Sequence, residues 1–302
     1  IVDLRGDIVA IEEHTTSYAE GPGPYLATLT ETVRGLLNRR TQAGRQGVVF
    51  GIGVGVSGLV DPASGTALET SVLHWHNVEL KSALEEFGLP VLVENDVNAF
   101  ALGEVWFGHG RGMNNLLCVT IGAGVGLGVI VDGGIYRGAH RGAGEFGHVR
   151  VSTDPGAPID SAGIQGSVEA FASDDSILAY YRETGPGGTG GGTTDPASVS
   201  DLAAAARRGD ENAAQAIRRA ARHLGIGVAA LINLFDPETI LLSGEGIGDA
   251  DVWMPSIQDA IAESTAYGLD RLCPIKIVPS DESMWVRGVA TLVVQEVFRL
   301  NI

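Results

Sequence analysis

The stretch Glu94–His148 decides the fold, because it holds three polar motifs separated by apolar runs. The first motif, Glu94-Asn95-Asp96-Val97-Asn98, follows the apolar run Pro90–Val93, which is typical of a buried strand. Side chains at the carboxyl end of such a strand face the crevice of an α/β sheet, where ligands bind. The pattern therefore predicts that Asn95 and Asp96 lie in a ligand-binding site.

The second motif is a run of glycines after another predicted strand. Leu116–Ile121 is apolar and rich in β-branched residues, and Gly122–Gly128 follows it directly. Glycine lets backbone N–H groups approach an anion closely, so Gly122, Gly124 and Gly126 are candidates for a phosphate cradle. Close packing of strands explains the same glycines equally well, and both interpretations stay open.

The third motif, Gly144-Glu145-Phe146-Gly147-His148, places a carboxylate and an imidazole among glycines. We expect these two groups, together with Glu169, to bond the hydroxyls of a small polar molecule, because paired acceptors reject analogues that lack the hydroxyl. Structural roles are the alternatives: Asp96 as a helix N-cap and His148 as a satisfied core histidine.

Composition limits the partners of this chain of 302 residues. It has 20 basic and 37 acidic residues, a net charge of −17, so the segment is not expected to hold a nucleic acid by itself. Its only cysteines, Cys118 and Cys273, form no disulfide framework, which indicates a cytoplasmic setting. No secretory signal or long apolar run is present, so no membrane partner is expected.

The rest of the chain alternates predicted strands and helices, the pattern of an α/β protein. A hairpin is predicted at Ile1–Ala10, strands at Gly47–Val54, Ile130–Ile135, Thr239–Leu242 and Ile275–Val278, and helices at Tyr25–Arg40, Glu79–Phe87, Asn98–Phe107, Leu202–Arg208, Asn212–Leu234, Trp253–Ser264 and Trp285–Phe298. Three loops are predicted: a crevice loop at Gly55–Asp61, a loop at Ser71–Leu80 with Trp75 as a lid or packing residue, and a mobile glycine-rich loop at Gly185–Thr194. His74 and His76 alternate as a metal pair would, but no cysteine or carboxylate cluster lies nearby in sequence.

Taken together, Glu94–Asn98, Gly122–Gly128, Gly144–His148 and Glu169 resemble the ROK family, which joins sugar kinases to sugar-responsive transcriptional repressors. The resemblance covers nearly the whole chain. It implies an α/β fold of the two-lobed, actin-like ATPase (hexokinase) type with a central cleft, and a homodimer. With a boundary at the glycine-rich break after residue 108, the expected lobes are residues 1–108, joined by a returning helix at 286–302, and residues 109–285.

The resemblance also assigns roles to residues. It implies that the sugar is bound by Asn95, Asp96, Glu145, His148 and Glu169. In a kinase of the family, Asp96 would be the catalytic base that accepts the proton of the attacking hydroxyl. ATP with Mg²⁺ would then contact Gly122, Gly124, Gly126 and Gly244, although a strand-to-helix turn explains Gly244 as well.

One segment departs from the family's pattern. The family usually holds zinc with a histidine, matched here by His148, and three cysteines spaced Cys-x-Cys-Gly-x-x-Gly-Cys-x-Glu. The matching run Asp160–Glu169 keeps both glycines and the glutamate but has no cysteine. One imidazole and one carboxylate fall short of the four ligands of structural zinc, so we expect the zinc site to be lost and no cofactor to be present.

Two functions follow from the resemblance. We predict a sugar-binding effector domain of a ROK-type transcriptional regulator, a repressor of carbohydrate-metabolism genes, rather than an enzyme. The replaced zinc ligands, the regulator-like final helix and the lack of an Asp-x-Gly-Gly-Thr phosphate loop before the first hairpin favour it. DNA would then be bound by a winged-helix segment upstream of Ile1. The alternatives are an ATP-dependent hexose kinase and a degenerate binding domain without either activity.

Overall fold

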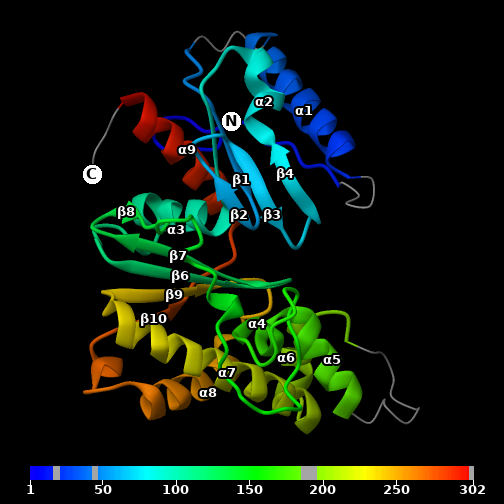
Figure 1. The fold of residues 1–302 in the computed structure, drawn as a ribbon, viewed down its shortest axis with the longest axis vertical. Coiled ribbons are helices and arrows are strands. Elements are labelled where there is room, and N and C mark those ends of the chain that lie inside the picture. Colours follow the sequence, from blue (N-terminus) through cyan, green and yellow to red (C-terminus); the bar gives the residue numbers. More distant parts are fainter. Residues whose placement is uncertain (16–20, 43–46, 185–195, 299–302) are drawn as a thin grey trace. The chain divides into compact units, whose positions relative to one another are not determined.

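The computed structural model describes residues 1–15, 21–42, 47–184 and 196–298, so the predicted loop at Gly185–Thr194 lies outside the described residues. The chain divides into two compact units (Figure 1). Unit 1 comprises Ile1–Gly112, Gly133–Ala143 and Asp281–Ile302, and unit 2 comprises Met113–Asp132 and Gly144–Ser280. Each unit combines strands and helices, as the alternating pattern predicted.

Unit 1 is built on two small sheets. β1 (Ile52–Val56) pairs in parallel with β5 (Val91–Asn95), in a register that sets Val56 opposite Asn95. β2 (Leu59–Asp61), β3 (Thr66–Thr70) and β4 (Trp75–Glu79) form an antiparallel meander. The hairpin predicted at the start of the chain is reduced to one antiparallel bridge between Val2 and Ile8.

The helices of unit 1 cover these sheets. They are α1 (Pro22–Gln42), α2 (Leu80–Leu84) with the 3-10 turn η2 (Glu85–Phe87), α3 (Asp96–Phe107) and α9 (Glu282–Phe298), while β8 (Gly134–Ile135) belongs to the short segment 133–143. Helix α9 packs against α3 and β1 (Figure 1). This packing requires glycine at Gly288, where a Cβ would lie 1.8 Å from the carbonyl oxygen of Ala99.

Unit 2 has a mixed sheet in the order β10-β9-β6-β7. β6 (Leu116–Ile121) pairs antiparallel with β7 (Val125–Val131) and parallel with β9 (Thr239–Ser243), which in turn pairs parallel with β10 (Ile275–Ile277). β6 and β9 are almost wholly buried. This explains their continuous apolar sequences, since a strand covered on both faces shows no alternation.

The helices of unit 2 complete its core. They are α4 (Val168–Ala172), α5 (Asp174–Thr184), α6 (Val199–Arg207), α7 (Glu211–Phe235) and α8 (Ala250–Ser264), with the 3-10 turns η3 (Phe146–His148) and η5 (Leu269–Arg271). α7 lies beside α8 (Figure 1). Asp210 caps α7 by accepting from the N–H groups of Asn212 and Ala213, and the helix ends at Asp236, which has left-handed backbone.

Four local predictions need correction. The strand predicted at Gly47–Val54 begins only at Ile52, and part of the predicted crevice loop, Leu59–Asp61, is strand β2. Half of the loop predicted at Ser71–Leu80 is β4, and of the two roles predicted for Trp75 the structure shows packing, since Trp75 is 2% exposed and meets Tyr25 edge-on. The glycine loop is also shorter than predicted, because the second half of Gly122–Gly128 belongs to β7. In the last three cases, pairing with a neighbouring strand overrides the local turn signals of glycine, serine and asparagine.

Candidate functional site

The predicted site residues divide between the two units, and the group in unit 1 is organised by Glu94. This side chain is 2% exposed at the end of β5. Its Oε2 accepts from the guanidinium of Arg137, with distances of 2.7 Å to Nε and 2.6 Å to Nη2. Its Oε1 accepts from the Asn95 N–H and from Asn98 Nδ2, both at 3.0 Å. Glu94 is thus a buried anion neutralised within unit 1.

Asn95 is the N-cap of α3, a role that the sequence interpretation had considered for Asp96. Its Oδ1 accepts from the N–H of Asn98 at 3.0 Å, and its Nδ2 donates to the carbonyl oxygen of Gly58 at 3.0 Å. The side chain therefore ties the start of α3 to the segment after β1. Asn95 has a structural role whatever else it binds.

Asp96 is the first residue of α3 and is partly buried. Its Oδ1 accepts from the Val97 N–H at 2.9 Å. Burial raises the pKa of the Asp96 carboxyl above its ordinary value, against the effect of backbone N–H groups that lower it. A carboxyl with a raised pKa at a helix N-terminus is suited to accept a proton or a hydroxyl hydrogen bond.

Asn98 supplies a buried acceptor in the same group. The residue is 6% exposed, and its Oδ1 has no hydrogen-bond partner among the described residues. A buried amide oxygen without a partner costs stability, so such atoms in native proteins usually meet water or a ligand.

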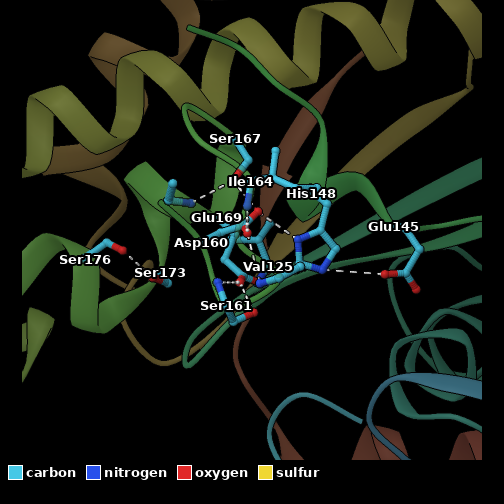
Figure 2. A network of polar contacts seen from close by, with 12 residues as sticks. Val125, Glu145, His148, Asp160, Ser161, Ile164, Ser167, Glu169, Ser173 and Ser176 are labelled. Atoms are coloured by element: carbon cyan, nitrogen blue, oxygen red, sulfur yellow. Dashed lines mark hydrogen bonds and ion pairs between the residues drawn. The ribbon is translucent and has the colours of Figure 1, made fainter. Parts of the chain in front are cut away.

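The group in unit 2 is organised by Asp160, and it brings together His148, Glu169 and Glu145 (Figure 2). The Asp160 side chain is fully buried, and its Oδ2 lies 2.9 Å from His148 Nδ1. Hydrogen bonds from Ser167 and His148 hold the pKa of Asp160 below its ordinary value despite burial. Asp160 is therefore ionised and can only accept, so His148 Nδ1 carries the proton and donates it.

His148 faces three carboxylates. Its Nε2 lies 3.7 Å from Glu145 Oε2, while Asp160 occupies Nδ1. Burial lowers the pKa of His148, but the hydrogen bond that it donates to Asp160 and the charges of Glu169, Asp160 and Glu145 raise the pKa above the ordinary value overall. The imidazole is therefore held as a donor toward acidic groups.

Glu169 lies in the first turn of α4 and is 7% exposed. Its Oε1 accepts from Ser161 Oγ at 2.6 Å and from the Ser161 N–H at 3.3 Å, and its Oε2 accepts from the Val125 N–H at 3.2 Å (Figure 2). The carboxylate thus connects the start of β7 to the loop that carries Asp160. Its position is fixed by protein donors on both oxygens.

The glycines proposed for a nucleotide have mainly structural surroundings. Gly122 and Gly124 form the tight β6–β7 turn, where the Gly122 N–H donates to the Gly124 carbonyl at 3.0 Å, and Gly126 lies inside β7 opposite Thr120. Gly244 has a φ of +141°, and a Cβ there would lie 1.7 Å from the Ile121 carbonyl oxygen. Close packing therefore requires glycine at Gly244, independently of any ligand.

A carboxylate lies between these two glycine turns. Asp174, the first residue of α5, donates its N–H to the Gly122 carbonyl at 2.8 Å, and its Oδ1 would lie 2.7 Å from a Cβ on Gly246. This Oδ1 is buried without a hydrogen-bond partner in the described part of the chain. Burial, followed by the charges of Glu245 and Asp175, raises the pKa of Asp174 to about 6.

The spacing of His148, Asp160 and Glu169 would allow a metal ion, since one ligand atom from each lies within 4.8 Å of the others. The sequence expectation counted one carboxylate here, and this was wrong, because Asp160 adds a second. The donor set nevertheless does not suit the family's zinc, since structural zinc takes four ligands that are mostly thiolate or imidazole. Asp160 already accepts four hydrogen bonds, from His148 Nδ1, Ser167 Oγ and the N–H groups of Ala162 and Ile164. An ionised carboxylate has about four lone-pair positions, so none is left for a metal.

Sequence reasoning missed the residues that organise both groups. Arg137 was seen only as part of a loop, Asp160 and Ser167 only as residues at replaced cysteine positions, Ser161 only as a residue between two such positions, and Asp174 not at all. A signal existed for Asp160 and Ser167: an acidic residue and a hydroxyl residue at two former ligand positions can bond to each other. No local signal pairs Arg137 with Glu94, which lies 43 positions away.

An apolar cavity of unit 1 lies elsewhere. It has a volume of about 940 Å³ and is lined mainly by aliphatic residues of the first hairpin, α1, the start of β1 and α9. None of the predicted site residues lines it. His74 and His76 are also separate from the site: both are exposed, and His76 Nδ1 pairs with Glu69 at 2.8 Å. Neither feature includes a predicted sugar-binding residue.

The fold and its polar groups define the class first: a two-unit α/β protein of the hexokinase type, with hydrogen-bonding side chains at strand ends and in a structured loop. The chain belongs to the ROK family, which matches residues 1–296. Among the described residues, no helix combines the length and the apolar character needed to cross a membrane.

Relatives of this chain include both repressors and kinases. It is 33% identical to a xylose repressor of Caldicellulosiruptor bescii over 219 residues, which cover 70% of this chain and 54% of the repressor. It thus spans about half the length of the repressor it matches. A ROK family glucokinase from Streptomyces griseus, solved with glucose and AMPPNP, superposes with a TM-score of 0.77 at 30% identity, covering 97% of this chain and 94% of the kinase. A ROK family transcriptional regulator, a homolog of the E. coli MLC protein, also superposes with a TM-score of 0.77. The identity is 28%, and the match covers 91% of this chain and 72% of the regulator.

Proposed function

We propose that this chain is the sugar-binding effector domain of a ROK-type transcriptional regulator. The sugar contacts that we propose are Asn95, Asp96, Glu145, His148 and Glu169. Carboxylate, amide and imidazole groups of this kind bond sugar hydroxyls, and hydrogen bonds with neighbouring residues hold His148 and Glu169 in fixed orientations.

The observation that carries the choice of regulator over kinase is Asp174. Its backbone N–H bonds Gly122, and its buried Oδ1 lies beside Gly246, so the residue is at the glycine turns that we propose a nucleotide would contact in a kinase. At neutral pH the group is ionised, because its pKa is about 6. A fixed negative charge there opposes the phosphates of ATP, and the repulsion is strong where the dielectric constant is low.

The proposed partners follow from charge and from the relatives. A net charge of −17 leaves this chain unsuited to hold DNA by itself, so we propose that a separate DNA-binding segment of the same polypeptide does so. The sequence similarity to a xylose repressor over 70% of the chain supports this assignment. We also propose that the regulator is a homodimer and that its sugar-binding domain needs neither ATP nor zinc.

The test is to incubate the purified chain with ATP, Mg²⁺ and a panel of hexoses and pentoses that includes D-glucose and D-xylose. We expect at least one sugar to raise the thermal unfolding midpoint, because a ligand that binds only the folded state stabilises it. We expect no ADP to form. Sugar-dependent turnover would overturn the regulator assignment.

A hexose kinase is the second candidate, and the raised pKa of Asp96 favours it. A general base works best when its pKa lies near the working pH, and burial shifts Asp96 in that direction. If the chain is a kinase, Asp96→Asn should lower turnover at least about 100-fold while sugar still raises the unfolding midpoint. In the regulator, the same variant should change only the midpoint shift that the sugar produces.

A further inference from the structure

We propose that Asp160 is a positioning residue that holds His148 without a metal, so that Nε2 is the imidazole atom offered to a hydroxyl-rich ligand. The inference rests on the proposed sugar-binding function. It assigns to Asp160 a role that nothing in the sequence similarity supplies, because the family's usual zinc ligands are absent from this loop.

The hydrogen bond between the two residues has a fixed direction. The Asp160 side chain has no exposed surface, and it receives four hydrogen bonds from protein donors. Such a carboxylate is a saturated acceptor. His148 Nδ1 must therefore donate to Oδ2, and this fixes both the tautomer and the plane of the ring.

Ser167 connects the residues that hold His148 and Glu169. Ser167 Oγ donates to Asp160 Oδ2 at 2.6 Å and accepts from the Ala170 N–H at 3.2 Å, which makes Ser167 the N-cap of α4. Glu169 lies in the first turn of the same helix. One set of hydrogen bonds thus places the imidazole and the second carboxylate together (Figure 2).

His148 Nε2 is the ring nitrogen that Asp160 leaves available. The His148 side chain is 24% exposed, and its Nε2 lies 3.7 Å from Glu145 Oε2, which is longer than a hydrogen bond. Nε2 and the exposed Glu145 carboxylate can therefore bond neighbouring hydroxyls of one ligand. A metal on Nδ1 would leave the same nitrogen available, so a buried carboxylate at this position replaces the orienting effect of the ion.

The first measurement asks whether a metal is needed. The full chain is purified with and without EDTA, its metal content is determined by mass spectrometry, and its thermal unfolding midpoint is measured. We expect no stoichiometric metal and no change of midpoint with EDTA. One tightly held metal ion per chain, with a midpoint that falls on chelation, would overturn the proposal.

The second measurement reads the tautomer directly by NMR, with ¹⁵N-labelled histidine and His148 assigned by comparison with His148→Gln. We expect a slowly exchanging proton on Nδ1 in the unsubstituted chain and its loss in Asp160→Asn. Asp154→Asn is the matched control, because Asp154 is an exposed residue of the same loop, and its side chain accepts from the Gly156 N–H, which an amide oxygen can also do. An unsubstituted chain without a proton on Nδ1 overturns the proposal even if Asp160→Asn fails to fold.

The third measurement connects position to binding, with D-glucose and D-xylose as probes. Asp160→Asn should weaken the affinity for the bound sugar about tenfold or more, and Asp154→Asn should not. Unchanged affinity in Asp160→Asn overturns the positioning role. If neither sugar nor any member of the wider panel binds the unsubstituted chain, the proposed function fails, while the NMR experiment still decides how His148 is held.

Discussion

In unit 1 a buried glutamate, Glu94, is neutralised by the guanidinium of Arg137, whereas in unit 2 a buried aspartate, Asp160, is held by one imidazole, one hydroxyl and two backbone N–H groups. Glu94 lies at the junction of a strand and a helix, so regular secondary structure fixes its backbone. Asp160 lies in a loop, and its own hydrogen bonds fix that loop.

Because of this difference, the two groups should respond differently to substitution of a single residue. An arginine neutralises a charge, so removing it leaves a buried anion without a compensating charge, which is among the costliest single changes in a protein. Several neutral donors share the stabilisation of a carboxylate, so removing one of them leaves the others in place. We therefore expect the unit 1 group to fail abruptly and the unit 2 group to weaken by steps.

The largest expected effect is that of Arg137→Met. It should lower the free energy of unfolding by about 3 kcal/mol, at the lower end for a broken buried pair because the Arg137 side chain is 36% exposed. Denaturant unfolding measures this. Adding Glu94→Gln should recover part of the loss, since the buried charge is then gone.

The control for that prediction is the exposed pair Arg34–Glu86, with side chains 46% and 51% exposed. Arg34→Met should change the free energy of unfolding by no more than about 0.5 kcal/mol. Equal losses in Arg34→Met and Arg137→Met would mean that burial of Glu94 does not govern the unit 1 group.

The second-largest expected effect is that of Ser167→Ala in unit 2. Ser167→Ala removes both the cap of α4 and a donor to Asp160, and should cost about 2 kcal/mol of unfolding free energy. Ser198→Ala is the matched variant, because Ser198 caps α6 in a capping box on the surface. It should cost about 1 kcal/mol. If both variants lose the same amount, the bond from Ser167 to Asp160 contributes nothing to stability.

The smallest effect is a gain in stability from Asp174→Asn. The pKa of Asp174 in the folded chain, about 6, exceeds its ordinary value of 3.8, so the folded state binds this proton more tightly than the unfolded state. The unfolding free energy therefore falls as pH rises from about 4 to about 6, and the penalty is complete above that range. Asp174→Asn should stabilise the chain by about 1 to 2 kcal/mol more at pH 8 than at pH 5. Thermal unfolding at both pH values checks this, and a gain that does not depend on pH contradicts it.

Many elements could be predicted from the sequence because they are coded locally. The strand Leu116–Ile121 and the helix before Phe107 follow from apolar runs and periodicity, and both are found at or near the predicted bounds. The meander β2–β4 was missed, because its strands are short and polar on one face and are stabilised by pairing with one another. Trp75 could be placed in the core only once β4 was known to face α1.

The candidate site shows the same division. The motifs and the family resemblance led us to propose Asp96, His148 and Glu169 as site residues. It did not reveal that Asn95 rather than Asp96 caps α3, or that Asp160 bonds His148. These facts depend on side-chain geometry across separate segments, and no spacing rule contains that geometry.

By itself, the sequence determined the family, the α/β class, the acidic charge and the absence of the three cysteines, because these are properties of residue identity and local order. Only the tertiary structure decided that Asp160 bonds His148 and that Arg137 neutralises Glu94. It also decided that Asp174 lies at the glycine turns. The physical reason is that burial removes water as a partner. Each buried polar atom then depends on whichever distant segment packs against it.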